Sequence, residues 1–109
     1  MPKYLVVAGY TAPDGVKGLI VDGGTVRVRA IEELLSSVGG RLESFYYGLG
    51  RVTAYLIIEV PDEASAVAVT LTVNASGLGD WILTPLMAPA EIDEAVKLSP
   101  LYDAPGPTG

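Results

Sequence analysis

The sequence predicts an α+β domain of the ferredoxin-like kind, a βαββαβ sandwich followed by a short C-terminal helix. Apolar residues recur at helical spacing over 25–38, Asp62 can cap a second helix at 63–74, and each of the two helices lies between two β-prone runs. The run at 52–60 is almost wholly apolar, which is typical of a strand buried on both faces. The 109 residues suit one domain, which we place at 1–98, and the Pro- and Gly-rich residues 99–109 form a flexible tail.

The first half of the chain predicts a strand and a long helix. Residues 4–10 are rich in Val and Tyr, and a turn sequence follows them. The apolar stretch 16–21 is short, so we interpret it as one helical turn or an irregular loop before Gly23 and Gly24. Apolar residues then recur at helical spacing over 25–38, and Gly39 with Gly40 ends that helix.

The second half predicts three strands and two helices. Asp62 is a good N-cap for the second helix, because its side chain can accept hydrogen bonds from free backbone N–H groups. Pro85 has no N–H, so its strand lies at a sheet edge or ends there. The elements are strands at 41–49 and 52–60, a helix at 63–74, a strand at 81–86 and a short helix at 89–98.

The apolar content predicts self-association. Half of the residues are hydrophobic and only 18% are charged, which is a surplus for so small a domain. Alternation along strands divides the first two strands into two sets, and neither is strongly polar. The sets are Tyr4, Val6, Ala8 with Leu42, Ser44, Tyr46, and Leu5, Val7, Gly9 with Glu43, Phe45, Tyr47. We expect another copy to cover the open sheet face; the alternative is a monomer whose sheet is covered on both faces.

Composition excludes several classes of function. The net charge is −6, and Arg27 with Arg29 does not make a basic patch, so we expect no nucleic acid as a partner. The chain has no Cys and no His, so we expect no metal and no cofactor. The start of the chain lacks a signal-peptide layout and no apolar run is long enough to span a membrane. We therefore expect a cytoplasmic protein without a membrane partner.

Several glycine-containing motifs together resemble the GYD-domain family. They are residues 4–11 (YLVVAGYT), 15–18 (GVKG), 23–25 (GGT), 39–46 (GGRLESFY), Pro61 with Asp62, 75–77 (ASG) and 84–86 (TPL). The resemblance extends over about residues 3–97 and implies a dimeric α/β-barrel fold, in which two sheets pack face to face. It implies no particular reaction.

The chain departs from the family pattern at two places. The family is named for a Gly-x-Tyr-Asp turn, and here Gly50-Arg51-Val52-Thr53 lacks both the Tyr and the Asp. If that pair carries an activity in the family, this protein has lost or moved it. Ala88 also stands where a Ser or Thr cap is usual before the last helix.

Four residues are candidates for binding a ligand, and each has a structural alternative. Tyr10 and Tyr46 end the first two strands and could line one pocket mouth, where a phenol donates a hydrogen bond; otherwise they fill the core. Trp81 could stack on an aromatic ligand or anchor the core. Asp14 could act as a base or simply shape the Asp14-Gly15 turn.

Two strand carboxylates have their own interpretation. An inward-facing Glu43 or Glu59 needs a cationic partner, and a structural ion pair is the better interpretation than a catalytic one. The available partners in the sequence include Arg27, Arg29 and Arg51.

The sequence favours a homo-oligomer that binds a small organic molecule in an apolar pocket between the sheet and the long helix. If it is an enzyme, which the sequence leaves open, its chemistry is independent of cofactors. The alternative is a non-catalytic assembly or regulatory module.

Overall fold

The elements follow one another in the predicted order. The computed structural model describes residues 1–10, 14–48 and 53–107, with the side chains of 14–16 left aside. The elements are β1 (Lys3–Tyr10), α1 (Asp14–Ser36), β2 (Arg41–Gly48), β3 (Thr53–Glu59), α2 (Glu63–Ala75), β4 (Gly79–Leu86) and α3 (Pro89–Ala95). This order confirms the predicted βαββαβ fold with a short C-terminal helix.

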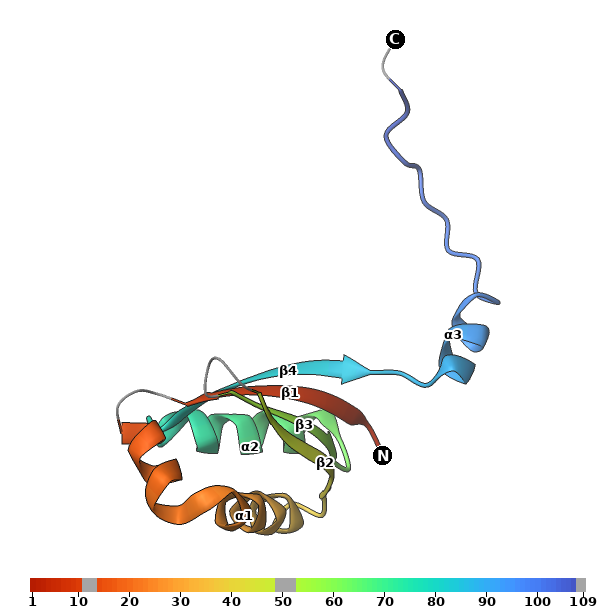
Figure 1. Ribbon diagram of the computed structural model, residues 1–109. Coiled ribbons are helices and arrows are strands. Elements are labelled where there is room, and N and C mark those ends of the chain that lie inside the picture. Colours follow the sequence, from red (N-terminus) through yellow and green to blue (C-terminus); the bar gives the residue numbers. More distant parts are fainter. Residues whose placement is uncertain (11–13, 49–52, 108–109) are drawn as a thin grey trace.

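The four strands form one antiparallel sheet in the order β2-β3-β1-β4. Helices α1 and α2 both lie against one face of this sheet, and the other face carries no helix (Figure 1). Strand β4 lies at an edge, as Pro85 predicts. The side of the sheet that faces away from α1 and α2 is called the open face from here on.

The core lies between the sheet and the two helices. The buried residues of β1 and β3 alternate along each strand, so every second side chain faces the helices. Leu35 of α1 and Val69 of α2 close the core from the helix side. The core residues are Tyr4, Val6, Ala8, Leu35, Ala54, Leu56, Ile58, Val60, Ala66, Val69 and Trp81.

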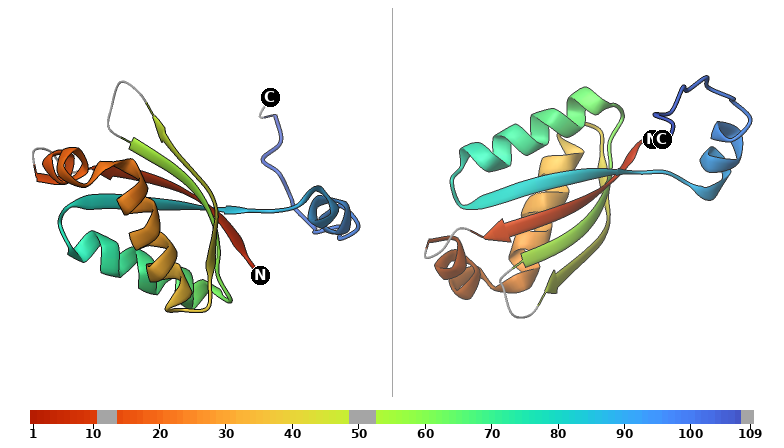
Figure 2. Two further views of the ribbon diagram at one scale, coloured as in Figure 1. Left: turned by 60° about the horizontal axis from the view of Figure 1, so that its bottom comes forward. Right: turned by 90° about the horizontal axis from the view of Figure 1, so that it is seen from above.

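A kinked helix corrects one expectation. The stretch 16–21, predicted to be a single turn or a loop, belongs to α1, which is helical from Asp14 to Ser36 apart from Gly23. Gly23 has φ 77° and ψ 176°, a backbone conformation that glycine adopts without a steric penalty. The predicted break at Gly23 is therefore a change of helix direction, visible as a bend in α1 (Figure 2).

A β-bulge in β2 corrects the predicted strand faces. Leu42 pairs with Ile58, but the next paired residue is Ser44, opposite Ile57. The extra residue reverses the alternation, since two residues of one strand then oppose one of the other. Beyond the bulge Phe45 and Tyr47 lie on the helix side, and Tyr46 lies on the open face.

The chain leaves the sheet after β4. Helix α3 and the extended residues 96–107 stand away from the domain (Figures 1 and 2), and every residue from 84 to 107 is exposed. The radius of gyration is 18.0 Å, whereas a compact domain of this length would have about 13 Å. We call residues 87–107 the arm.

In the described ranges no helix combines the length and the apolar character that crossing a membrane requires.

Candidate functional site

A crevice lies between the sheet and α1, at the end of the sheet where β1 finishes. The register puts Tyr47, Ala54, Ala8 and Trp81 side by side across the four strands on the helix side. Two small residues thus form the floor between two large aromatic ones. The lining consists of Ala8, Gly9, Tyr10, Ile31, Phe45, Ala54, Leu56, Gly79 and Trp81.

The crevice is nearly closed. Its cavity measures about 20 Å³, which is room for about one water molecule. Ile31 reaches it from α1, so the position of this helix sets the size of the cavity. An organic molecule could enter only if α1 or the aromatic side chains moved.

Tyr47 joins the sheet to the kink of α1. Its hydroxyl donates a hydrogen bond to the Gly24 carbonyl at 3.1 Å. Its ring is stacked on Tyr10 with 6.4 Å between centroids and meets Phe45 edge-on at 5.0 Å. A Cβ at Gly24 would lie 3.1 Å from the Tyr47 ring, so a glycine is needed for this close approach.

The electrostatics of Tyr47 favour its neutral form. Burial, and then the interaction with Tyr10, raises the pKa of Tyr47 to about 12. At neutral pH the group is therefore a phenol that donates a hydrogen bond and not a phenolate that accepts a proton.

Asn74, near the end of α2, hydrogen-bonds both the backbone N–H and the backbone carbonyl of Trp81. The Trp81 N–H donates to the Asn74 Oδ1 at 2.8 Å, and the Asn74 amide donates to the Trp81 carbonyl at 3.4 Å. The side chain is only 5% exposed, which agrees with the core-anchor interpretation. Its edge still forms one wall of the crevice.

The structure brings together two of the four candidate residues. Tyr10 and Trp81 line the same crevice. Tyr46, predicted to share a pocket mouth with Tyr10, lies on the open face and is 72% exposed; the bulge in β2 is the reason for this error. The side chain of Asp14 lies outside the described residues.

The sequence reasoning missed Tyr47, which takes the place expected for Tyr46. The adjacent tyrosines carry the same chemistry, and only the strand face distinguishes them. A bulge in an otherwise regular strand leaves no clear mark in the composition of residues 41–48.

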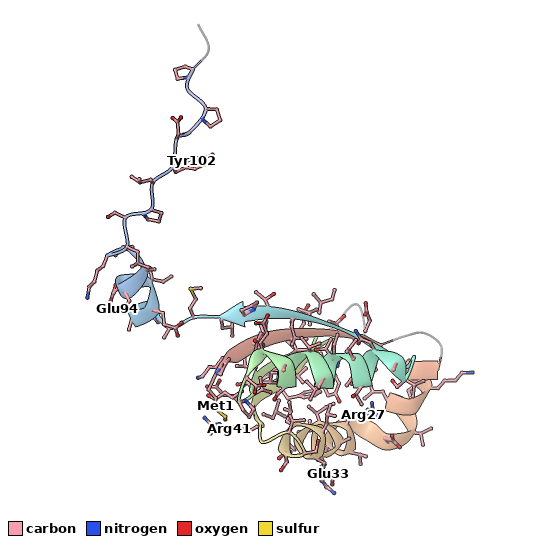
Figure 3. All side chains as sticks on the ribbon, turned by 180° about the vertical axis from the view of Figure 1, so that it is seen from behind. Met1, Arg27, Glu33, Arg41, Glu94 and Tyr102 are labelled. Atoms are coloured by element: carbon pink, nitrogen blue, oxygen red, sulfur yellow. The ribbon has the colours of Figure 1, made fainter. Side chains whose placement is uncertain are left out.

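A cluster of four charged residues lies at the opposite end of the sheet. Arg41 Nε is 2.6 Å from Glu59 Oε2, and Lys3 Nζ is 3.3 Å from Glu59 Oε1 and 3.2 Å from Glu43 Oε1. Figure 3 shows Arg41 at the end of the domain where Met1 also lies. The predicted ion pairs are thus present, with Arg41 and Lys3 as the partners.

Glu59 is the central acceptor of this cluster. The hydrogen bond from Arg41 lowers the pKa of Glu59 to about 2, although burial acts in the opposite direction. The hydrogen bonds to Glu43 and Glu59 raise the pKa of Lys3, and that to Glu59 raises the pKa of Arg41. These pairings support a structural role for Glu59.

Comparison with known families decides what kind of chain this is. The sequence model of the GYD domain matches residues 4–96, which is most of the chain. The chain belongs to the GYD domain family. No curated protein and no solved structure matches this GYD-domain chain.

Most of the segment that corresponds to the namesake turn of the GYD family lies outside the described residues. Its counterpart here is Gly50-Arg51-Val52-Thr53, and residues 50–52 lie outside the described residues. Thr53 begins β3 and pairs with Gly9 of β1.

The described part of this GYD-domain chain offers no group of three or more metal-ligating side chains. The crevice is lined by the Tyr10 phenol, the Trp81 ring and apolar side chains, and the Tyr47 phenol lies next to it, stacked on Tyr10. Such groups can orient a molecule or donate a hydrogen bond to an oxygen atom on it.

Proposed function

We propose that this GYD-domain protein is a homo-oligomer that binds a small, neutral or weakly polar organic molecule in the crevice. The observation that carries the proposal is the floor of the crevice: Ala8 and Ala54 lie between Tyr47 and Trp81 in one row across the sheet. Because the floor residues are small, a ring could lie between the aromatic side chains once α1 or those side chains moved. The rest of each strand face is filled by larger core residues.

The lining indicates the chemical class of the ligand. The described lining residues are apolar or aromatic and carry no charged side chain. A charged ligand would lose its hydration there without a compensating partner. The phenols of Tyr10 and Tyr47 are the groups able to orient a carbonyl or hydroxyl oxygen.

Opening of the crevice would occur at the kink of α1. Gly23 interrupts the helix, and the hydrogen bond from Tyr47 to Gly24 fastens that point to the sheet. A ligand that displaces this single bond could enlarge the cavity without unfolding either half of α1. If the protein is an enzyme, Tyr47 acts as a neutral hydrogen-bond donor that orients an activated substrate, because a phenol with a pKa of about 12 neither loses its proton readily nor is available as a base at neutral pH.

Native mass spectrometry of freshly purified protein tests the ligand. We expect an added mass on the wild type and its loss in Ala54→Leu, which fills the floor. Ala30→Leu, at an exposed position of α1, is the matched control and should keep the added mass. A wild type without any added mass, or an Ala54→Leu variant that keeps it, contradicts this site.

Self-association rests on the open face of the sheet. Tyr46, Tyr55, Val7 and Ile82 form one row across it. The next row contains Ile57 and Leu5 between Ser44 and Thr84. A sheet face this apolar is ordinarily covered by a second sheet, and a second copy of the chain would supply that sheet.

Light scattering with a matched pair of variants tests self-association. The chain mass is 11.4 kDa, and we expect the wild type at micromolar concentration to have twice that mass or a higher multiple. Ile82→Glu on the open face should lower the mass to that of one chain. Val21→Glu is the control, because Val21 is also exposed but lies on α1. A wild type with the mass of a single chain contradicts the proposal.

The second candidate function is a non-catalytic assembly or regulatory module. The observation that favours it is the closed crevice of about 20 Å³ beside an uncovered sheet face. A defined oligomer without added mass in the mass spectrum would support this candidate over ligand binding.

A further inference from the structure

The arm, residues 87–107, stands on the open-face side of the sheet. In Figure 1 helices α1 and α2 lie below the sheet, whereas α3 and the residues after it rise above its level. Figure 3 shows Glu94 and Tyr102 far from the residues labelled on the domain. The arm thus lies beyond the end of β4 and rises on the side away from α1 and α2, within reach of a copy that covers the open face (Figures 1 and 2).

The arm exposes several large apolar side chains. Ile92 and Val96 are four residues apart, so they lie on the same side of α3 and the turn that follows it. They are 48% and 74% exposed. Large apolar side chains continue beyond them at Leu98, Leu101 and Tyr102, all exposed. Such a series is typical of a segment that docks on another surface.

An unoccupied apolar groove lies on the outside of the domain, between α2 and the edge strand β4. It measures about 290 Å³, and its walls include Tyr4, Val67, Leu71, Leu83 and Pro85. Val67 and Leu71 of α2 are 51% and 65% exposed. Helix α2 has no charged residue after Glu63, so this side of the helix is apolar as well.

We propose that α3 of one copy docks into the α2–β4 groove of a second copy, with Ile92 and Val96 against Val67 and Leu71. The proposal rests on the self-association proposed above. The chain's own arm points to the side of the sheet opposite α2 (Figure 1), so its own groove is not the one that it faces. The polar side of α3, with Lys97 and Glu94 paired at 3.0 Å, is left toward water.

The area of the open face suggests that the arm contributes to the interface between two copies. Four strands of seven or eight residues cover about 500 Å² in flat projection, from the usual strand spacing and rise. A stable interface of standard size needs about 800 Å² on each partner. Side chains make the accessible surface of the open face larger than its flat projection, but the face stays no larger than a standard interface, and an arm that contacts the partner would add to the buried area.

Cysteine cross-linking tests the docking, because the natural chain has no Cys to interfere. Full-length Val96→Cys and full-length Val67→Cys are mixed in equal amounts, equilibrated and oxidised. We expect a disulfide-linked pair of chains to form at least fivefold faster than in a mixture of Lys97→Cys with Val67→Cys. Lys97 is adjacent but on the polar side, and disulfides need closely placed Cα atoms. Each variant oxidised alone gives the background.

The doubly substituted chain Val67→Cys, Val96→Cys decides between docking within and between chains. We expect linked pairs at twice the chain mass. A disulfide closed within one chain overturns the proposal, and so does an equal rate for Lys97→Cys and Val96→Cys.

Light scattering on the same samples separates the two proposals. A dimer without the Val96–Val67 link overturns the docking of the arm and leaves the self-association standing. A protein with the mass of a single chain overturns both.

Discussion

Glu59 is a carboxylate that its neighbours keep ionised at low pH. Arg41 and Lys3 both contact it, and its pKa is about 2 instead of the usual 4.5. The unfolded chain binds a proton at this group more readily than the folded chain does. The contribution of Glu59 to stability is therefore fully present above about pH 4.5 and is lost as the pH falls toward 2.

The Glu59→Gln variant should lack this part of the pH dependence of stability. We expect the melting temperature of the wild type to fall from pH 5 to pH 2.5, and that of Glu59→Gln to fall less, because the amide does not titrate. Thermal unfolding followed by circular dichroism in small pH steps measures both. Glu33→Gln, exposed on α1, is the control and should keep the wild-type slope. Parallel curves for wild type and Glu59→Gln would contradict the assignment.

Two adjacent tyrosines show what single residues can and cannot reveal in a sequence. The sequence predicts a tyrosine from the end of β2 near the crevice, and Tyr47 lies there, stacked on Tyr10. Whether Tyr46 or Tyr47 supplies it depends on strand alternation, which the bulge between Leu42 and Ser44 reverses. Ion pairing of Glu59 could be predicted, but its partners depend on the register that places Arg41 and Lys3 beside it.

At the scale of elements, periodicity predicted every strand and helix except the first half of α1. That half has Gly15, Gly18 and Gly23 in it, and glycine lowers helix propensity. The structure continues the helix through Gly18 and uses Gly23 alone for the change of direction. Sequence spacing could locate the break, but it could not show that helix lies on both sides of it.

The connection from α1 to β2 depends on a glycine that has no room for a side chain. A Cβ at Gly40 would lie 2.6 Å from the Glu59 carbonyl oxygen and 3.3 Å from that of Leu35. The Gly40 N–H also donates to the Leu35 carbonyl at 2.8 Å, which fixes its position. Both neighbours are backbone atoms, so an added methyl group would displace the turn or the start of β2.

Gly40→Ala should therefore lower the free energy of unfolding by about 1–3 kcal/mol, as overpacking does elsewhere. Gly18→Ala is the matched control. It lies within α1 with no heavy atom within 4 Å of its Cβ, so we expect a gain of about 0.5–1 kcal/mol. Urea unfolding at one protein concentration measures both. A Gly40→Ala variant as stable as the wild type would contradict this prediction and show that the turn can shift to make room for a methyl group.

For the whole molecule, the surplus of apolar residues in the composition lies on two exposed surfaces of the structure. One is the open face of the sheet, and the other is the arm with the groove on α2. Composition alone predicted the first, since a two-layer fold leaves one sheet face bare. It could not predict the second, because composition indicates a tail only at residues 99–109, whereas the chain departs from the sheet earlier, after Leu86.

A dimer held by these surfaces should melt at a temperature that depends on protein concentration. Unfolding then includes dissociation, so mass action stabilises the folded pair as the concentration rises. We expect about 5–10 °C between concentrations a hundredfold apart, from the linkage energy and the usual entropy of unfolding. Calorimetry of wild type, Ile82→Glu and Val21→Glu measures this. Ile82→Glu should melt at a concentration-independent temperature, while Val21→Glu should follow the wild type. A wild type whose melting temperature is constant would mean that it unfolds as a single chain.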